Sequence, residues 1–186
     1  MNNPSKSAWS IIIILCLLGL EFFFAAKIVK ADDIPLETRL ARQAERFQSA
    51  KDQPVDTAEL GCAIAGVTRS REWAAFLLTL AVHESGLAER IRVGDCRPHE
   101  CDGGRAWGLW QNWRSQQNDA VWGSPDLAVQ AKAAAHLGTQ MFNMCRSAGV
   151  PFPLGTFRAL GGRGCKHPLP GEDKRVATYQ RILKGI

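Results

Sequence analysis

One carboxyl of the chain stands where a general acid could work. Glu84 lies in the segment Ala-Val-His-Glu-Ser-Gly at residues 81–86, at the end of an apolar run that predicts a buried helix. Apolar surroundings disfavour the charged form of a carboxyl and raise its pKa. Such an acid can protonate the leaving oxygen of a glycosidic bond near neutral pH. The alternative is a helix-end glutamate followed by a stop glycine, which is a common surface feature.

No basic residue close in the sequence is expected to pair with Glu84, although Arg105 or a cation from a distant segment remains an alternative. The nearest basic residue upstream is Arg71, which lies too far along the helix to touch the carboxyl. The next one downstream is Arg90, which follows the break at Gly86. Desolvation is therefore expected to outweigh ion pairing at this carboxyl.

A second segment gives this carboxyl a partner motif. Residues 104–111 read Gly-Arg-Ala-Trp-Gly-Leu-Trp-Gln, about 25 residues after Glu84. Glu-Ser-Gly followed at this distance by Ala-x-Gly-Leu-x-Gln resembles the soluble-lytic-transglycosylase-type domain of the lysozyme-like superfamily. The resemblance is strongest over residues 72–111. It implies that Glu84 is the sole catalytic acid and base, that Ser85 lies in the substrate site and that Gln111 contacts the glycan.

The same resemblance implies a fold, a substrate and a product. The fold would be a mostly α, lysozyme-like helical domain with long loops. The reaction would cleave the β-1,4 bond between N-acetylmuramic acid and N-acetylglucosamine in peptidoglycan and leave a 1,6-anhydromuramic end. Neither a metal nor a cofactor is implied.

Two later stretches depart from the pattern of this family. Residues 157–164 lack the Tyr-Asn pair that usually precedes the last helix, which puts a second polar contact in doubt. In residues 175–183 the tyrosine, Tyr179, comes one place late. Tyr179 is a candidate substrate contact, and packing is the alternative. The degraded motif also keeps open a non-catalytic subunit that binds peptidoglycan or serves in assembly.

Aromatic and acidic residues supply further candidates. Trp107, Trp110 and Trp113 follow one another at short spacing, and indole rings pack on the apolar faces of sugars. Trp113 is the expected exposed platform, whereas Trp107 and Trp110 bind sugar or fill core. Asp95 and Asp102 are candidate second carboxylates. Either could hold a water for the alternative reaction, hydrolysis by a lysozyme.

Five cysteines follow the N-terminal segment, and in an oxidising compartment they indicate disulfides. Local loop closure favours two pairs, Cys96 with Cys101 and Cys145 with Cys165, and leaves Cys62 over. A zinc fragment built on Cys96, His99 and Cys101 is the weaker alternative, because structural zinc sites need four ligands. No metal site is predicted.

The N-terminus predicts export. Residues 11–20 are apolar and follow a short polar segment with one cation, Lys6, as in a secretory signal that is cleaved after Ala31. The alternative is an uncleaved anchor over residues 8–29, which Glu21 would weaken. Either reading places the protein in the periplasm or cell envelope. The membrane is expected to hold the protein only through this segment.

The elements that must position the candidates are helices. Helical spacing of apolar residues predicts an amphipathic helix between Pro35 and Pro54 and a buried helix over 71–85. A helix starting at Ser-Pro-Asp (124–126) and running to about Cys145 and a closing helix over 173–184 complete the set. Residues 94–108 and 149–164 are rich in Gly and Pro and are expected to be loops.

Composition limits the classes that remain. The chain of 186 residues is 46% apolar and 22% charged, which excludes a disordered tail. We expect residues 1–31 to be signal or anchor, 32–56 an N-terminal helix and linker, and 57–186 the main domain. The formal net charge of +5 does not demand nucleic acid, and none is predicted. The expected partners are peptidoglycan strands and a secretion or conjugation apparatus that must open the wall.

Overall fold

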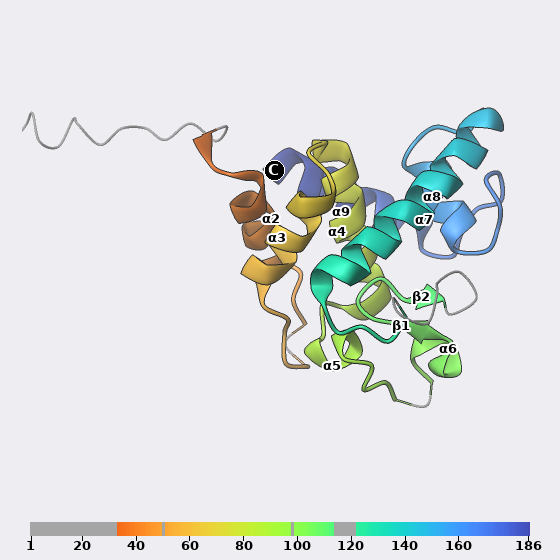
Figure 1. Ribbon diagram of the computed structural model, residues 1–186. Helices are drawn as coiled ribbons and strands as arrows, with labels where there is room; N and C mark the ends of the chain where they lie inside the picture. The colour runs from red at the N-terminus through yellow and green to blue at the C-terminus, as the bar shows by residue number, and fades with distance from the viewer. Residues whose placement is uncertain (1–32, 50, 98, 114–121) are drawn as a thin grey trace, which may run out of the picture. The chain divides into compact units, whose positions relative to one another are not determined.

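The computed structural model describes residues 33–49, 51–97, 99–113 and 122–186. This part of the chain is mostly helical, as expected. Its elements, shown in Figure 1, are α2 (Leu36–Glu45), α3 (Thr57–Val67), α4 (Arg71–Ser85), α5 (Glu89–Arg92), α6 (Cys101–Gly104), β1 (Ala106–Trp107), β2 (Asn112–Trp113), α7 (Leu127–Ser147), α8 (Leu154–Leu160) and α9 (Glu172–Gly185). The two short strands pair as an antiparallel hairpin.

Helix α4 forms the centre of the core and ends where the sequence predicts. Ser70 caps its start by accepting a hydrogen bond from the backbone N–H of Trp73 at 3.3 Å. Gly86 ends it in the left-handed conformation, with φ of 62°. Every residue from 74 to 81 is buried, so the helix is surrounded by its neighbours α2, α3, α7 and α9. The first turn is exposed at Arg71 and Glu72, and the last turn, which carries Glu84, is partly exposed.

The other predicted helices are confirmed. Asp126 caps α7 by accepting hydrogen bonds from two backbone N–H groups, and the helix runs on to Ser147. Leu40 and Ala44 of α2 are buried in the same core as α4. Residues Pro35–Ile186 form one compact unit.

Two predicted loops contain helices that the sequence analysis missed. The segment 149–164 includes α8, whose Phe157 is fully buried and packs on Phe76 with ring centroids 5.0 Å apart. The segment 94–108 includes α6 and β1. Helices α3 and α5 were also not predicted. Packing against α4 and α7, rather than local propensity, holds α8 in place.

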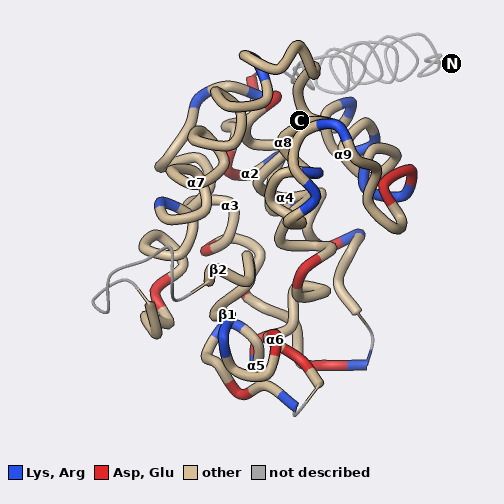
Figure 2. The backbone as a smooth tube through the Cα atoms, turned by 90° about the vertical axis from the view of Figure 1, so that its right-hand side faces the viewer, with Lys and Arg blue, Asp and Glu red and all other residues tan. Residues whose placement is uncertain are grey.

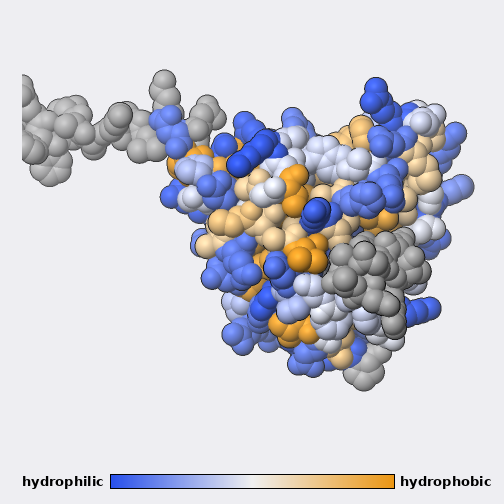
Figure 3. Space-filling view, in the orientation of Figure 1, coloured by the Kyte–Doolittle hydropathy of each residue, from blue (hydrophilic) through white to orange (hydrophobic). Residues whose placement is uncertain are grey.

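Polar residues lie mainly on the surface, and most large apolar residues of the described part are buried or half-buried. On the face drawn in Figure 3, hydrophilic residues dominate the outline and apolar residues gather toward the middle. Among the described residues, three large apolar side chains count as exposed: Val93, Trp113 and Met144. Of these, Trp113 belongs to the candidate site.

Both predicted disulfides are confirmed. Cys96 is bonded to Cys101, and Cys145 to Cys165. Cys62 is the remaining free cysteine of the described part and is exposed. The zinc alternative is wrong, because the two sulfur atoms that it requires as thiolates are bonded to each other.

The second disulfide carries a stability prediction. Cys145–Cys165 spans 20 residues, and loss of that constraint on the unfolded chain costs about 3 kcal/mol in the chain-entropy treatment. Replacing both cysteines by serine is therefore expected to lower the melting temperature by about 6–12 °C. Cys62→Ser is the matched control and should leave it unchanged. Equal melting temperatures for the double variant and this control would contradict the prediction.

The predicted signal or anchor over residues 1–31 lies outside the described residues. Within the described part, no helix is both long enough and apolar enough to cross a bilayer.

Candidate functional site

A cleft of about 730 Å³ lies where the end of α4 meets α9, the β1–β2 segment and the end of α8. This volume is in the usual range for ligand sites. Its lining comes from six parts of the chain and comprises Leu80, Glu84, His99, Cys101, Asp102, Trp110, Gln111, Asn112, Trp113, Ala134, Leu137, Ala159, Leu160, Gly161, Gly162 and Arg175.

Glu84 occupies this cleft together with a cation that the sequence analysis did not foresee. Arg175 of α9 donates a hydrogen bond from Nη1 to Glu84 Oε1 at 2.5 Å. The Glu84 side chain is 30% exposed and that of Arg175 21%, so both reach the cleft. The sequence analysis could not place this cation beside Glu84, because the two residues are 91 positions apart in the sequence.

The contact between α4 and α9 includes a second polar pair beside the first. His83 Nε2 lies 3.1 Å from Thr178 Oγ1. Burial lowers the pKa of His83, and the charge of Arg175 lowers it further, while Glu84 partly offsets both effects. A neutral imidazole is thus favoured here. Figure 2 shows the two helices side by side, so these contacts fix Arg175 relative to Glu84.

Gln111 lines the cleft from a tight turn. Its backbone has φ of 49°, and its N–H donates to the carbonyl of Gly108 at 3.1 Å. The side-chain Nε2 donates to the same carbonyl at 3.0 Å and lies 3.5 Å from Cys101 Sγ. The donor Nε2 is thus engaged within the protein. The acceptor Oε1 is the atom that can accept a hydrogen bond from a ligand.

Buried Gln130 of α7 holds this turn in position. Its Oε1 accepts from the backbone N–H of Leu109 at 2.9 Å, and its Nε2 donates to the carbonyls of Arg92 and Ser124. On the other side, Trp110 Nε1 donates to the carbonyl of Leu77 in α4 at 2.8 Å. The segment that bears Gln111 is therefore fixed to both α7 and α4.

Glycine at position 108 is required by this arrangement. Its φ is 74°, and an added Cβ would lie 2.3 Å from Gln130 Oε1. We expect Gly108→Ala to destabilise the fold by about 1–3 kcal/mol more than Gly103→Ala, since it displaces a buried hydrogen-bonding side chain. Gly103 also has positive φ but has open space around it, so it controls for backbone strain. Urea unfolding of both variants measures the difference, and equal values would contradict the close-approach argument.

The three candidate tryptophans have different environments. Trp113 is 38% exposed and lines the cleft, as expected for a sugar platform. Trp110 also lines the cleft but is 5% exposed and mostly fills core. Trp107 does not line it. Its ring pairs with Trp122 at 5.5 Å, and both border a second hollow of about 320 Å³.

Three other predicted site residues are not brought to the cleft. Tyr179 is 3% exposed and packs edge-on against Phe152 and Phe157, so it belongs to the core. Ser85 donates to the carbonyl of Ala81 and accepts from the N–H of Leu87, which closes the end of α4. Asp95 is exposed and is absent from the lining, whereas Asp102 is part of it.

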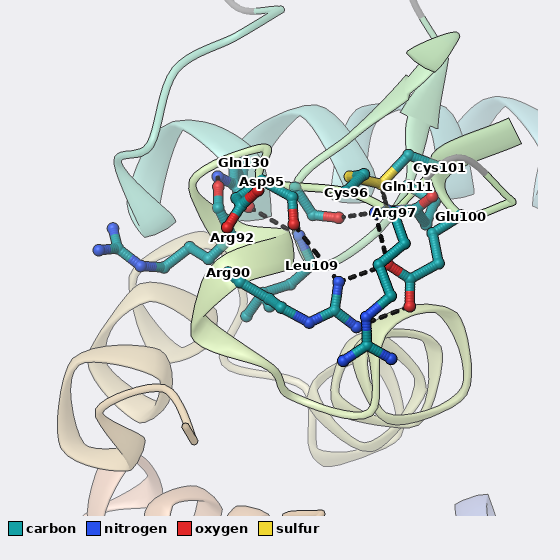
Figure 4. Close-up of a disulfide and its surroundings, with 11 residues drawn as sticks. Arg90, Arg92, Asp95, Cys96, Arg97, Glu100, Cys101, Leu109, Gln111 and Gln130 are labelled. Carbon is teal, nitrogen blue, oxygen red and sulfur yellow. Dashed lines mark hydrogen bonds and ion pairs between the residues drawn. A yellow bond between two sulfur atoms is a disulfide. The ribbon is translucent and has the colours of Figure 1, made fainter. Parts of the chain in front are cut away.

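An ion-pair network supports the loop that brings Asp102 to the cleft. Arg90 binds Glu100 with both terminal nitrogens (Figure 4). Its Nε also donates to Asp52 at 3.0 Å. Glu100 also accepts from the backbone N–H of Arg97 at 2.8 Å. The contact with Arg90 lowers the pKa of Glu100 to about 2, against an opposing effect of burial. With the Cys96–Cys101 disulfide, this network fixes the loop at both ends.

The low pKa of Glu100 predicts a pH dependence. A carboxyl whose pKa is lower in the folded state stabilises the fold above its unfolded value, and the effect is lost as pH falls toward the folded value. Glu100→Gln should therefore melt a few degrees below the natural protein at pH 7. The gap should close between about pH 4.5 and pH 2. Exposed Glu45 supplies the control Glu45→Gln, and a gap that is independent of pH would contradict this account.

The sequence analysis did not assign three parts of the lining to the site: Arg175, His99 and the end of α8. His99 was considered only as a zinc ligand. The end of α8 had been predicted as loop. For Arg175 no local signal exists, because its partner lies on a distant helix.

Comparison with known proteins adds no relative to this description. No family model matches the chain, and neither a curated protein nor a solved structure matches it. The geometry of the cleft therefore carries the functional argument.

Proposed function

We propose that the protein cleaves the β-1,4 bond between N-acetylmuramic acid and N-acetylglucosamine in peptidoglycan, with Glu84 as the catalytic acid and base. The fold would then be a lysozyme-like domain. The proposal also places the protein outside the cytoplasm, in the periplasm or cell envelope, where glycan strands are accessible. Freestanding wall remodelling and service to a secretion or conjugation apparatus are both compatible with this activity.

The observation that carries the proposal is the convergence of two sequence motifs in one cleft. Glu84, at the end of α4, and Gln111, from the turn before β2, line the same cavity. Exposed Trp113 lines it as well. A carboxyl, an amide oxygen and an indole face together suit a sugar chain, which presents an ether oxygen, hydroxyl groups and apolar C–H faces.

The contact with Arg175 is compatible with an acid step. Oε1 of Glu84 accepts a hydrogen bond from Arg175, and Oε2 has no protein donor among the described residues. A proton carried on Oε2 can pass to the oxygen that leaves C1 of the muramic residue, and this oxygen keeps the electron pair of the broken bond. The substrate's own N-acetyl oxygen would stabilise the cation at C1.

The same carboxylate can complete the reaction as a base. It takes the proton of the C6 hydroxyl of the muramic residue while that oxygen bonds to C1. The products are a shortened strand and a 1,6-anhydromuramic end, and no water is consumed. Arg175 holds the carboxylate in position during both transfers.

Hydrolysis is the second candidate, and the position of Asp102 favours it. This carboxyl lines the cleft with Glu84 and could hold a water on the opposite side of the sugar ring. Asp95, the other carboxylate considered, does not line the cleft. Asp102→Asn separates the two routes, since it should stop hydrolysis and spare the intramolecular reaction.

Release of soluble fragments from dye-labelled sacculi tests the proposal against a binding role. The purified full chain is expected to release dye in proportion to time and enzyme concentration. A protein that sediments with sacculi and releases no dye would be a binding or assembly subunit, and the proposed activity would be wrong.

A further inference from the structure

One cation at the edge of the cleft is held in place without a carboxylate partner among the described residues. Arg105 donates from Nε to the backbone carbonyl of Asp102 at 2.9 Å. Its guanidinium carbon lies 5.3 Å from the centre of the Trp113 ring, within the distance of a cation–π contact. Asp102 and Trp113 both line the cleft, so the guanidinium is fixed between two residues of its wall.

The charge of Arg105 is available to a ligand. Five other arginines of the described part lie in ion pairs with carboxylates of the protein: Arg90, Arg92, Arg97, Arg158 and Arg175. Arg105 is exposed, and no described carboxylate lies within ion-pair distance of it. Asp102 contributes its carbonyl oxygen rather than its carboxylate. Within the described part of the chain, the terminal nitrogens of Arg105 therefore keep their donors for an outside acceptor.

A stacked guanidinium is well suited to a carboxylate. Its planar fork presents two parallel N–H donors, and stacking on the indole limits the rotamers that it must give up on binding. An uncharged sugar polymer offers no group that uses this positive charge. A polymer that carries carboxylates beside its sugars does.

We propose that Arg105, stacked on Trp113, binds a carboxylate borne by the substituent of the muramic residue and so selects anionic peptidoglycan over neutral glycans. This inference rests on the proposed function and specifies its substrate. The carboxylate has two sources: the acidic peptide attached to the lactyl group, or the lactyl group itself where the peptide has been removed. In both cases the sugar ring and the charged substituent contact neighbouring side chains of one wall.

Affinity measured in the Glu84→Gln background tests this without any need for turnover. The ligands are soluble glycan strands that bear peptides and strands stripped of peptides by an amidase. Each is used as prepared and after conversion of its carboxylates to methylamides. The proteins are full-length Glu84→Gln and the same chain with Arg105→Ala added. Arg69→Ala in the same background is the charge-matched control, since Arg69 is exposed and precedes the opposite end of α4, about 22 Å from Glu84 along the helix.

The effect of Arg105→Ala on affinity is expected to depend on whether the ligand carries free carboxylates. Adding Arg105→Ala to the Glu84→Gln chain should weaken its binding of a carboxylate-bearing strand about fivefold to tenfold. Methylamidation of the strand should weaken its binding to the Glu84→Gln chain by a similar factor. Binding of the Arg105→Ala chain should not respond to methylamidation, and the Arg69→Ala chain should behave as its parent. Coupling on peptide-bearing strands alone assigns the peptide carboxylates. Coupling on stripped strands assigns the lactyl group.

Several outcomes overturn the inference and leave the proposed activity standing. These are equal sensitivity of both chains to methylamidation, a loss for Arg69→Ala as large as that for Arg105→Ala, or no binding of any strand. Absence of dye release from sacculi, in contrast, defeats the proposed activity and leaves the affinity coupling as the readout of this inference.

Discussion

Glu84→Gln is expected to lower the rate of glycan cleavage by about 10²–10⁴-fold, which is the usual contribution of a positioned general acid and base. The amide is nearly the same size as the carboxyl, so the cleft keeps its shape. It cannot donate a proton to the leaving oxygen or accept one from the C6 hydroxyl, and both steps are lost together. Dye release from sacculi at fixed enzyme concentration measures the effect.

The control for this variant is Glu45→Gln on α2. Glu45 is exposed and lies in the last turn of its helix, so the two variants have the same change of charge. Both proteins are expected to remain folded, which thermal melting checks, and the control should keep full activity. Full activity of a folded Glu84→Gln protein would remove Glu84 from the mechanism.

Arg175→Ala is expected to lower kcat by about 10–100-fold with a smaller effect on KM. The guanidinium is the hydrogen-bond donor that the described structure provides for Glu84, so its loss leaves the carboxyl free to rotate. Small losses of orientation at a reacting group have rate effects of this size. Arg175→Lys keeps the charge but not the planar fork and should recover part of the rate.

Lys174→Ala is the matched control, since Lys174 is the exposed neighbour of Arg175 on α9. If Arg175→Ala kept the natural kcat, the ion pair would be structural only. A loss in KM alone would instead make Arg175 a substrate contact, and the positioning role would be wrong.

Two of the helices that the sequence predicted correctly, α4 and α7, have ends that are marked by local chemistry. Ser70 and Gly86 mark both ends of α4, and Asp126 marks the start of α7. Such caps satisfy backbone groups within one turn, so they are readable without the rest of the fold. The short sequence separation of each disulfide made its pairing readable in the same way.

The helix α8 escaped prediction because its stabilisation is not local. The segment contains Pro151, Pro153 and several glycines, which favour a loop. Tertiary packing of Phe157 against Phe76, together with the bridge from Cys145 to Cys165, overrides that preference. Propensity is a weak signal when the buried face of a helix is supplied by distant residues.

Some of the predicted site residues line the cleft and others do not, and the difference has a physical cause. Glu84 and Gln111 of the two motifs line the cleft, together with the separate candidates Trp113 and Asp102. The side chain of Ser85 instead turns back to the backbone of its own helix, as serine often does at a helix end.

Arg175 and Tyr179 show why the contribution of α9 to the cleft could not be predicted from the sequence. They lie one turn apart on α9, and the sequence analysis selected Tyr179, which is buried in the core. Arg175 faces the cleft instead. Which face of α9 points to Glu84 is decided by packing against α4, and that packing has no local sequence signal.

Mass spectrometry of the strand ends released from sacculi tests the central claim most directly. The natural protein is expected to release fragments with 1,6-anhydromuramic ends, and Glu84→Gln, at the same concentration and time, is expected to release none. Reducing muramic ends in place of anhydro ends would move the assignment to hydrolysis with Asp102. Fragments from the Glu84→Gln protein in the same amount as from the natural protein, or no fragments from either, would contradict the account.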